Sequence, residues 1–391
     1  MALGMTIDRV QAEDIAKAGV AALQAGDGGA ARAHFEQLVE GGHATAAMRL
    51  MLARACAMAG DAAGEAAALD ALLANEPANP RILLMRGDCF RRSGDDRAAV
   101  SFFQSALAAA AALPAVPPEL ASELREAQGF IAASSQQFVK AVEDALTASG
   151  GGELRLRHAV DMLAGKREAY PQQPSVFYVP YLAPRQFFER EEFAWVAELE
   201  AQKDAIKQEL LALIEADSGF EPYVQPLENR PHRDFHGLLN DPSWSAFYLW
   251  RDGTLMEEQA ARCPATVEAL RNVPMSRVGS RTPSVLFSLL RPGAHIPAHT
   301  GMLNSRLICH LPLIVPEGCW LRVGNETRAV EEGKMLIFDD SIEHEAKNDS
   351  GETRIILLFD IWRPELSEAE RRGVSAIFDA IDRMGGVPAD H

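Results

Sequence analysis

The chain has 391 residues, of which 48% are hydrophobic and 24% are charged, a balance typical of a folded protein with two or three domains. This composition excludes a disordered chain, a collagen-like fold and a small disulfide-stabilised scaffold. Acidic residues outnumber Lys and Arg by 55 to 38, and the net charge of −17 argues against nonspecific nucleic-acid binding, which requires a basic surface.

The cysteines and the hydrophobic runs indicate the cellular compartment in which we expect the protein. The five cysteines are scattered and form no CxxC pair, so they indicate neither a disulfide framework nor a zinc-thiolate site. The N-terminal region lacks the apolar core of a signal peptide, and no apolar run of about 18 residues could span a membrane. We expect a cytoplasmic protein in a reducing compartment, without a membrane anchor.

The first third of the chain contains an internal repeat. The dipeptide Gly-Asp recurs with a spacing of 34 residues, and a large apolar residue follows nine residues after each glycine: Gly26, Gly60 and Gly94, then Phe35, Leu69 and Phe103. This period resembles the tetratricopeptide repeat, in which pairs of amphipathic helices stack on their neighbours. We predict tetratricopeptide-like helical repeats over residues 10–115; an irregular Ala-rich helical bundle is the alternative.

Further helices follow the repeats. Apolar residues near a 3.6-residue period predict a helical linker or cap over 116–170, interrupted by three glycines at 150–152. The Pro-rich stretch 170–174 marks a domain boundary, so we expect a second domain over 171–391. Two more amphipathic helices are predicted over 191–216 and 365–386.

From about residue 280 the pattern changes to short strands. Runs such as SVLFSLL, RLICHLPLIV and TRIILLFDIW are separated by turn residues, including Pro292-Gly293 and Gly324-Asn325. Many short strands at this spacing are typical of a β-sandwich or jelly roll. The chain is therefore predicted to be α+β, with helices first and a β-rich domain second.

Four of the ten histidines lie within fifty residues: His295, His299, His310 and His344. Imidazole is a good ligand for iron, zinc, copper or nickel, although a lone strand histidine such as His295 is more often structural. His299 precedes a turn and His344 follows a strand, and in a jelly roll two such strand ends can meet at one opening. We predict that these two histidines lie together.

Basic residues fall inside predicted strands. Alternation along RLICHLPLIV places Arg306, Ile308 and His310 on one face and leucines and Cys309 on the other. A cation inside a barrel is costly, so this face indicates a polar cavity or a bound anion, and Arg354 repeats the pattern at the start of another strand. The alternative is that both arginines are exposed or are paired with Asp339, Asp340 or Asp360.

A second histidine cluster lies upstream. Residues 232–236, HRDFH, contain a formal His-x-Asp pair in a stretch rich in Pro, Asn and Asp. This segment could be a metal site, a loop at the mouth of a substrate pocket, or a plain surface loop.

Residues 299–366 closely resemble the aspartyl/asparaginyl β-hydroxylase family. The matching segments are HTG, N-x-RL-x-x-H, P-x-GC, NET, EEGK, IFDDS-x-EHE and W-x-PEL, with a weaker match extending back to about residue 245. The resemblance implies an Fe(II)- and 2-oxoglutarate-dependent oxygenase with a double-stranded β-helix core, here at about 245–365. Members of the family often carry tetratricopeptide repeats before the catalytic domain.

The resemblance also implies roles for individual residues. Two histidines would bind iron without a carboxylate ligand, because Gly301 stands where most related oxygenases have an acidic residue. The implied assignments are His299 and His344 for the metal, with both also catalytic; Arg354, Ser288 and His310 for 2-oxoglutarate; and Arg306 for the substrate side chain. Animal members have a second arginine two positions after Arg306, where this chain has Ile308, which leaves the substrate residue open.

The implied reaction uses Fe(II), 2-oxoglutarate and O2, and hydroxylates an aspartyl, asparaginyl or related residue of a peptide or protein. The repeats could bind that substrate or a partner. Three alternatives remain: a repeat-based adaptor with an inactive oxygenase fold, a hydroxylase of a small molecule or lipid, and a cupin-type isomerase or dioxygenase. The last would be expected to carry a His-x-His pair where Pro297 and Ala298 stand.

Overall fold

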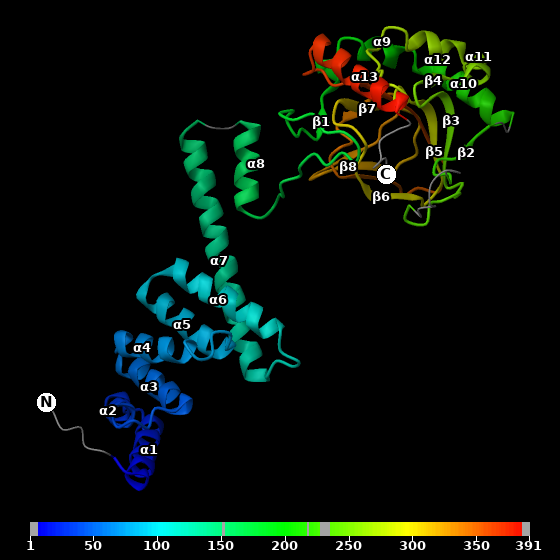
Figure 1. Cartoon of the computed structure of the whole chain (residues 1–391). Helices are drawn as coiled ribbons and strands as arrows, with labels where there is room; N and C mark the ends of the chain where they lie inside the picture. The colour runs from blue at the N-terminus through cyan, green and yellow to red at the C-terminus, as the bar shows by residue number, and fades with distance from the viewer. Residues whose placement is uncertain (1–6, 151–152, 217–218, 227–234, 385–391) are drawn as a thin grey trace. The chain divides into compact units, whose positions relative to one another are not determined.

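The computed structural model describes residues 7–150, 153–216, 219–226 and 235–384. The chain divides into two compact units, with the division between Lys166 and Arg167, close to the predicted start of the second domain. The first unit is helical and the second is built on β-sheets (Figure 1). Among the described residues, no helix is long and apolar enough to cross a membrane.

Three helix pairs form the N-terminal repeats, as the 34-residue period predicts. Each recurring aspartate caps the second helix of a pair: the side chains of Asp27, Asp61 and Asp95 accept hydrogen bonds from backbone N–H groups three residues further on. Gly60 and Gly94 end the preceding helices in the left-handed conformation, with φ of 73° and 80°. The helices are α1 (Arg9–Gln24), α2 (Gly28–Glu40), α3 (Ala46–Ala59), α4 (Ala62–Leu73), α5 (Pro80–Ser93) and α6 (Asp96–Ala111).

Glycine allows the closest helix crossings in the repeats. A Cβ atom added at Gly87 would lie 2.5 Å from the ring of Phe103, and one at Gly19 would lie 2.8 Å from the ring of Phe35. Both phenylalanines are at most 2% exposed. In the first and third repeats, the phenylalanine nine positions after the Gly-Asp glycine therefore packs against the helix that precedes that glycine.

We expect Gly87→Ala to destabilise the repeat unit by about 1–3 kcal/mol, because the new methyl group overpacks the buried Phe103 ring. Urea unfolding followed by helical circular dichroism measures the change. Gly129→Ala is the matched control, since nothing lies within 4 Å of a Cβ atom at that helical position. Equal effects of the two substitutions would show that the Gly87 crossing is not tight.

The second repeat departs from the pattern at Glu65, where small residues stand in the other copies. The Glu65 side chain is buried, and its carboxylate accepts hydrogen bonds from the guanidinium of Arg92 on α5. Because the charge is paired across two repeats, the acidic residue is accommodated at a crossing position.

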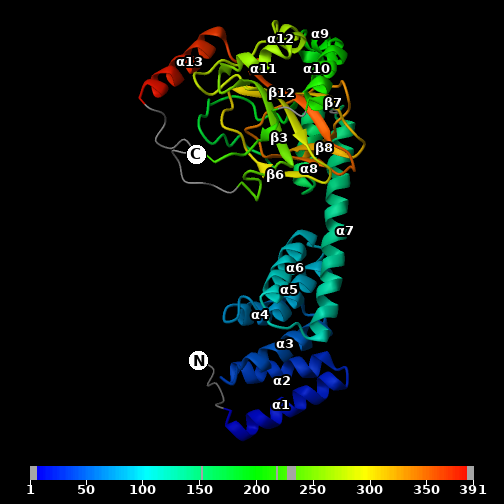
Figure 2. The same ribbon diagram turned by 90° about the vertical axis from the view of Figure 1, so that its right-hand side faces the viewer.

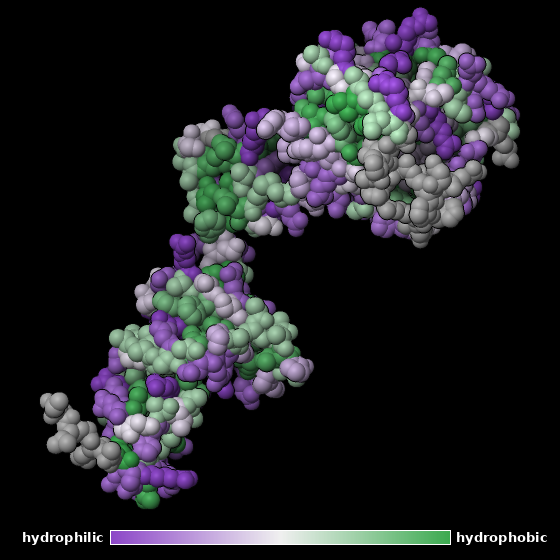
Figure 3. Space-filling model, viewed as in Figure 1, coloured by the Kyte–Doolittle hydropathy of each residue, from purple (hydrophilic) through white to green (hydrophobic). Residues whose placement is uncertain are grey.

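Two further helices follow the repeats in the first unit. Helix α7 (Pro118–Ala148) contacts α5 and α6, and α8 (Leu154–Leu163) contacts α7. The buried residues of α7 lie only near its start: Leu120, Leu124 and Ala127. Further along, apolar side chains are exposed at Phe138 of α7 and at Leu154 and Leu163 of α8. Figure 3 shows hydrophobic surface over this helix pair.

The second unit contains two antiparallel sheets. The larger has the order β1-β10-β7-β12-β5-β3-β2, with β4 paired to β3, and the smaller has the order β6-β11-β8-β9. The predicted jelly-roll-like β domain is thus confirmed in outline. The strands are β1 (Phe187–Phe188), β2 (Glu221–Pro222), β3 (Trp244–Arg251), β4 (Thr254–Leu255), β5 (Val285–Leu290), β6 (His295–His299), β7 (Arg306–Ile314), β8 (Cys319–Val323), β9 (Glu326–Ala329), β10 (Leu336–Phe338), β11 (His344–Asn348) and β12 (Arg354–Trp362).

The larger sheet has apolar residues on both faces. Its outer face packs against helices through Leu307, Cys309 and Leu311 of β7 and through Leu199 and Leu210 of the helices that cover it (Figure 2). Its inner face and the smaller sheet share a second core that includes Ile308, Phe338 and Leu321. The alternation predicted for β7 is therefore confirmed.

The helices of this unit differ in one respect from the prediction. The stretch 191–216 is not a single helix, because Phe193 and Trp195 pack into the core, where Trp195 contacts Phe359 edge-on at 6.0 Å. The predicted C-terminal helix is present. The elements are the 3-10 helix η1 (Arg190–Glu192) and the α-helices α9 (Val196–Ala201), α10 (Lys203–Glu215), α11 (Glu257–Ala261), α12 (Pro264–Ala269) and α13 (Glu368–Arg383).

Candidate active site

Two histidines meet where the strands of the smaller sheet pair. His299 ends β6 and His344 begins β11, and the two residues are register partners. Their ring centroids lie 4.2 Å apart. The predicted meeting of two distant strand ends is confirmed.

In both imidazole rings a backbone hydrogen bond engages Nδ1 and leaves Nε2 available as a ligand. Nδ1 of His299 lies 2.7 Å from the carbonyl oxygen of Pro297, and Nδ1 of His344 lies 3.0 Å from that of Ile342. A carbonyl oxygen only accepts, so each Nδ1 carries the proton and each Nε2 keeps its lone pair. Metal-binding histidines are oriented in this way.

Burial favours the neutral form of both rings. It lowers the pKa of His344 to about 3, with a further contribution from His299, and it also lowers the pKa of His299. Neutral imidazole is the form that ligates a metal, so the pair fits an imidazole-binding ion such as Fe(II).

Among the described residues, no third protein ligand accompanies the pair. Within the described part of the chain, no group of three His, Cys, Asp or Glu side chains is arranged to hold a metal ion. Gly301, two residues after His299, lies against Asp340: a Cβ atom at position 301 would be 2.0 Å from Oδ2 of that carboxylate. The carboxylate of Asp340 thus occupies the space that a side chain at 301 would need.

Gly301→Ala is expected to lower the free energy of unfolding by about 1–3 kcal/mol and to reduce metal affinity, because the methyl group must displace the buried Asp340 carboxylate beside His299. Thermal unfolding with and without added metal measures both effects. Gly351→Ala, in open space on a loop of the same unit, is the control. Unaltered metal affinity in Gly301→Ala would contradict the expectation.

The inner face of the larger sheet brings together three further predicted residues. Register pairs Ser288 of β5 with Ile356 of β12, and His310 of β7 with Leu358. Arg354 lies on the same face of β12 as Ile356 and Leu358, because it is two and four residues away from them and side chains alternate between the two faces of a strand. Ser288, His310 and Arg354 therefore face the space between the two sheets.

Arg354 is a buried cation without a counter-ion. It is 2% exposed, its Nε atom has no hydrogen-bond partner, and no carboxylate in the described residues forms an ion pair with it. Burial lowers the pKa of its guanidinium to about 10. A buried charge in this state requires an anion, and a guanidinium binds a carboxylate through two parallel hydrogen bonds.

His310 and Ser288 complete the lining. His310 is 6% exposed, its Nδ1 has no partner, and burial lowers its pKa well below the usual value, with further contributions from Arg354 and His344. The Oγ of Ser288 accepts a hydrogen bond from Nε1 of Trp244 at 3.3 Å. Since tryptophan only donates, the hydroxyl proton of Ser288 stays available for an acceptor.

Arg306 differs from Arg354. Its guanidinium lies 2.7 Å from Oδ2 of Asp360 and 3.0 Å from Oδ2 of Asp340, and all three side chains are buried. Burial raises the pKa of both carboxyl groups to about 6, while Arg306 opposes that shift. The alternative that these arginines pair with aspartates is thus confirmed for Arg306 and wrong for Arg354.

The other histidines are placed differently. His295 pairs with Glu345 at the surface, in agreement with a structural role. Residues 232–234 of the second cluster lie outside the described residues, and His236 contacts Phe235. The ring of Phe235 stands edge-on to His299 at a centroid distance of 5.3 Å.

Sequence reasoning missed Trp244 and its neighbour Tyr223, and it left the partners of Arg306 open. Trp244 donates to Ser288 and stacks on Tyr223 at 4.0 Å, and Asp340 and Asp360 hold Arg306. The aspartates appeared in the sequence only as possible partners of the arginines. Strand alternation could have placed Asp360 on the inner face, because it is two residues from Leu358 on the same strand.

Comparisons with known proteins agree with this geometry. Residues 200–364 match the family model described as aspartyl/asparaginyl beta-hydroxylase, and residues 17–80 and 65–114 match that of the tetratricopeptide repeat. The strands that carry all six predicted site residues lie inside the first match.

Three relatives illustrate the similarity. The human aspartyl/asparaginyl beta-hydroxylase is 38% identical over 183 residues, 46% of this chain and 23% of that protein. The ornithine lipid ester-linked acyl 2-hydroxylase of Rhizobium tropici is 37% identical over 45% of this chain and 60% of its own length. The human aspartate beta-hydroxylase domain-containing protein 2 is 31% identical over 53% of this chain and 55% of its own length. The chain therefore spans less than two thirds of each of these relatives.

Proposed function

We propose that the chain is an Fe(II)- and 2-oxoglutarate-dependent hydroxylase, because residues 200–364 match the aspartyl/asparaginyl β-hydroxylase family model and follow tetratricopeptide repeats. Its substrate would be an aspartyl, asparaginyl or related residue of a peptide or protein, hydroxylated at the β-carbon. The family similarity supports the reaction class, and the side chains between the two sheets support the cosubstrate.

His299 and His344 would hold the iron through their Nε2 atoms, oriented by the carbonyl oxygens of Pro297 and Ile342. Bound Fe(II) would supply the activation of O2 that is coupled to decarboxylation of 2-oxoglutarate to succinate. Position 301 cannot supply a carboxylate ligand, because it is a glycine and the Asp340 carboxylate fills the space that a side chain there would need. Water and cosubstrate would therefore fill more of the coordination sphere than in a site with three protein ligands.

The residues of the inner sheet face would bind and orient the cosubstrate. Arg354 would hold the carboxylate of 2-oxoglutarate that is remote from the metal, and the hydroxyl proton of Ser288 would add a third hydrogen bond. His310 is expected to contact the same molecule through its unpartnered Nδ1. Apolar neighbours such as Phe338 and Leu290 would keep bulk water from these contacts.

One observation carries this proposal: the guanidinium of Arg354 is 2% exposed, has no ion-pair partner among the described residues, and shares a sheet face with His310, whose pKa is lowered by burial and also by Arg354 and by His344 of the histidine pair. The test measures succinate formed from 2-oxoglutarate by anaerobically Fe(II)-loaded protein after air is admitted. Wild type is expected to form succinate, and His344→Ala is expected to form none. Absence of both succinate formation and 2-oxoglutarate binding in wild type would refute the oxygenase assignment and favour the adaptor.

The lipid alternative has one specific support, the similarity to the Rhizobium tropici ornithine lipid ester-linked acyl 2-hydroxylase. Offering ornithine lipid and peptide substrates separately to the same Fe(II)-loaded protein distinguishes the two readings. Oxygen incorporated into the acyl chain alone would replace the peptide substrate in the proposal. The five cysteines, all buried and unpaired, support the cytoplasmic location expected from the sequence.

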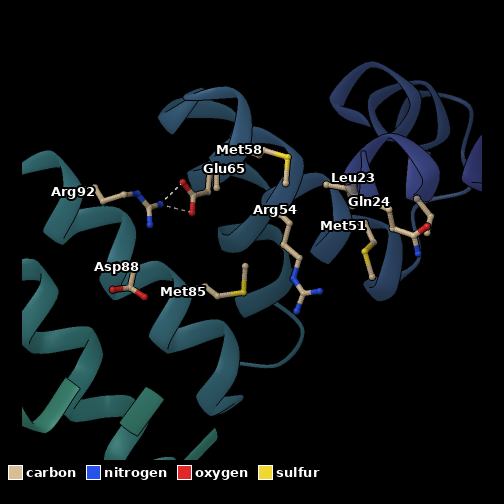
Figure 4. A pocket seen from close by; sticks show the side chains of 11 residues that line it. Leu23, Gln24, Met51, Arg54, Met58, Glu65, Met85, Asp88 and Arg92 are labelled. Carbon is tan, nitrogen blue, oxygen red and sulfur yellow. Dashed lines mark hydrogen bonds and ion pairs between the residues drawn. The ribbon is translucent and has the colours of Figure 1, made fainter. Parts of the chain in front are cut away.

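The repeats offer a place for a polypeptide. A groove of about 570 Å³ runs along the inner helices α1, α3 and α5, and Figure 4 shows Arg54 between Met51 and Met85 in it. Methionine side chains adapt to varied apolar partners, so we include in the proposal that this groove binds the substrate polypeptide. Its lining residues are Val20, Leu23, Gln24, Met51, Arg54, Ala57, Met58, Glu65, Met85, Asp88 and Arg92.

Met51→Glu is expected to raise KM for peptide substrates about tenfold, the equivalent of 1.4 kcal/mol, by replacing an apolar side chain of the groove with a charged one. The KM for a single capped amino acid, too short to reach the groove, should not change. The control is Val10→Glu, at an exposed apolar position of α1 outside the groove. A peptide KM equal to that of the control would remove the groove from the proposal.

A further inference from the structure

One short segment joins the two parts of the chain that carry the histidine pair. Residues 172–179, here called the strap, follow the division between the two units and lie before the matched residues 200–364. The strap contains most of the Pro-rich stretch 170–174, which by sequence alone indicates only a domain boundary. In the structure it bonds to the loop that follows His299 and to the loop that precedes His344.

The backbone of the strap donates hydrogen bonds to both of these histidine loops. One N–H reaches a carbonyl oxygen three residues before His344, and three N–H groups reach carbonyl oxygens two and three residues after His299. The bonds run from Gln173 to Ser341 at 2.6 Å, from Ser175 to Gly301 at 3.0 Å, and from Val176 and Phe177 to Met302, both at 3.1 Å. The strap therefore connects two loops that lie far apart in the sequence.

Gln172 joins the same two loops with its side chain. Its Nε2 donates to Oδ2 of Asp339 at 2.5 Å, and its Oε1 accepts from Nδ2 of Asn304 at 3.0 Å. Asp339 lies five residues before His344, and Asn304 lies five residues after His299. The Gln172 side chain is buried, and its two partners are 0% exposed. One buried amide therefore links the loops at equal sequence distances from the two histidines.

Both partners of Gln172 are also held by other bonds. The carboxylate of Asp339 accepts from the buried guanidinium of Arg363, and the side chain of Asn304 exchanges two hydrogen bonds with the backbone of Val179. Removal of the Gln172 amide therefore leaves the carboxylate and the Asn304 amide with partners, so the cost to the fold is small.

The strap is anchored on its other side by the C-terminal helix. The ring of Phe177 stands edge-on to Phe378 of α13 at a centroid distance of 5.3 Å, and Val176 and Val179 pack into the same apolar cluster. Phe378 is fully buried. The strap thus lies between a packed helix and the histidine loops, and it can hold those loops in place.

The strand pairing beside the histidines is irregular. His299 and His344 are register partners, but the register of β6 and β11 shifts between His344 and Ala346. An irregularity of this kind disrupts the ladder locally, so pairing alone fixes the two rings less tightly than a regular ladder would. Contacts beyond the strand ends must supply the remaining constraint, and the strap supplies them for both loops.

Resting on the metal site of the function proposed above, we propose that Gln172 is a positioning residue for the histidine pair. In this role it touches neither metal nor substrate, and it holds the two histidine loops at the separation that metal binding requires. Groups that orient metal ligands without binding the metal contribute roughly 10- to 100-fold to metal affinity. Because Gln172 acts through the loops rather than on the imidazoles directly, we expect an effect of about tenfold, the lower end of that range.

The test uses full-length protein in oxygen-free buffer, with Co(II) as the metal probe and titration calorimetry as the measurement. Gln172→Met keeps a side chain of similar length and removes both hydrogen bonds, so the Kd for Co(II) should rise about tenfold. Gln173→Ala is the matched control, since that neighbouring glutamine has an exposed side chain and its backbone bond to Ser341 survives. Its Kd should equal that of wild type.

A purely structural role would give a different result. Urea unfolding of the metal-free proteins should show little difference between Gln172→Met and wild type, because the partners of the amide keep other bonds. A loss of stability in Gln172→Met with an unchanged Kd for Co(II) overturns the proposal.

A measurement on the wild-type protein does not require any variant to fold. Linkage is reciprocal, so if the strap raises metal affinity about tenfold, the metal must stabilise the bonds of the strap by the same factor. Co(II) is therefore expected to slow hydrogen exchange of residues 172–179 about tenfold, measured by mass spectrometry. The loop amide of Asp61, which donates to Cys56 in the repeats, is the control and should not change. Exchange of the strap that is unaffected by Co(II) contradicts the proposal.

His344→Ala separates failure of this inference from failure of the proposed function. If wild type binds Co(II) no more tightly than His344→Ala does, the histidine pair is not a metal site, and the inference falls together with the proposed function. If wild type binds more tightly than His344→Ala but no more tightly than Gln172→Met, the metal site stands and the inference alone is wrong.

Discussion

Replacing Arg354 by methionine is expected to weaken 2-oxoglutarate binding at least about 30-fold and to abolish succinate formation at ordinary cosubstrate concentrations. Losing one partner of a buried, hydrogen-bonded charge pair costs about 2–5 kcal/mol. Nothing else described on the inner sheet face can replace this cation, since Arg306 is engaged by two aspartates. Anaerobic titration calorimetry with metal-loaded protein measures the affinity directly.

The same substitution should stabilise the ligand-free protein. Arg354 is buried without an ion-pair partner in the described residues, and burial disfavours its charged form. Thermal unfolding without 2-oxoglutarate should therefore give a higher Tm for Arg354→Met than for wild type, whereas added 2-oxoglutarate should raise the Tm of wild type alone. Arg291→Met, at an exposed position just after β5, is the control for loss of an arginine. If ligand-free Arg354→Met is strongly destabilised, the guanidinium has a structural partner and the anion site is refuted.

Replacing Arg306 by methionine should have the opposite effect on the protein itself. Two buried carboxylates would lose their shared counter-ion, and breaking a buried ion pair by removing one partner costs about 3–5 kcal/mol. Urea unfolding at neutral pH measures the loss. Further replacement of Asp340 and Asp360 by asparagine should recover part of it, because no uncompensated charge remains. Lys334→Met, which breaks a surface pair with Glu331, should change stability little.

The loss of stability caused by Arg306→Met should depend on pH. In the wild-type protein burial raises the pKa values of Asp340 and Asp360 to about 6, above the ordinary aspartate value of 3.8. The folded state therefore binds more protons than the unfolded state between these values, and the pair's contribution to stability falls as the pH rises through 6. Without Arg306 both pKa values should rise further, so the loss relative to wild type should be larger at pH 8 than at pH 5. An equal loss at both values would mean that neither carboxylate titrates in this range.

The repeats and the strand domain could be predicted because their signals are local and periodic. The Gly-Asp dipeptides predict helix ends and caps, and the structure shows why: the glycines adopt positive φ and the aspartates cap the next helix. The alternation along β7 predicts which residues face the site, and both cores agree with it. The proximity of His299 and His344 followed from their positions at strand ends, although sequence alone does not give the register that joins them.

The remaining features depend on contacts between distant segments. Arg306 and Arg354 look alike in the sequence, each at the start of a hydrophobic strand, yet two aspartates pair with the first and none with the second. Deciding between them requires the loop that places Asp340 beside Gly301. The break within 191–216 was missed because Phe193 and Trp195 contact the core of a sheet formed much later in the chain.

The long helix α7 has uneven support along its length. Its 31 residues correspond to about 46 Å at 1.5 Å per residue, and its buried residues all lie within the first third. Phe130 and Ile131 still pack against the repeats, and α7 also contacts α8. The two ends of one continuous helix should therefore open independently, with amides near Leu124 exchanging with deuterium far more slowly than those near Leu146. Local opening of this kind exposes a backbone to proteases without unfolding the repeats, so limited proteolysis of the folded chain is expected to cut the second half of α7 before it cuts the repeats.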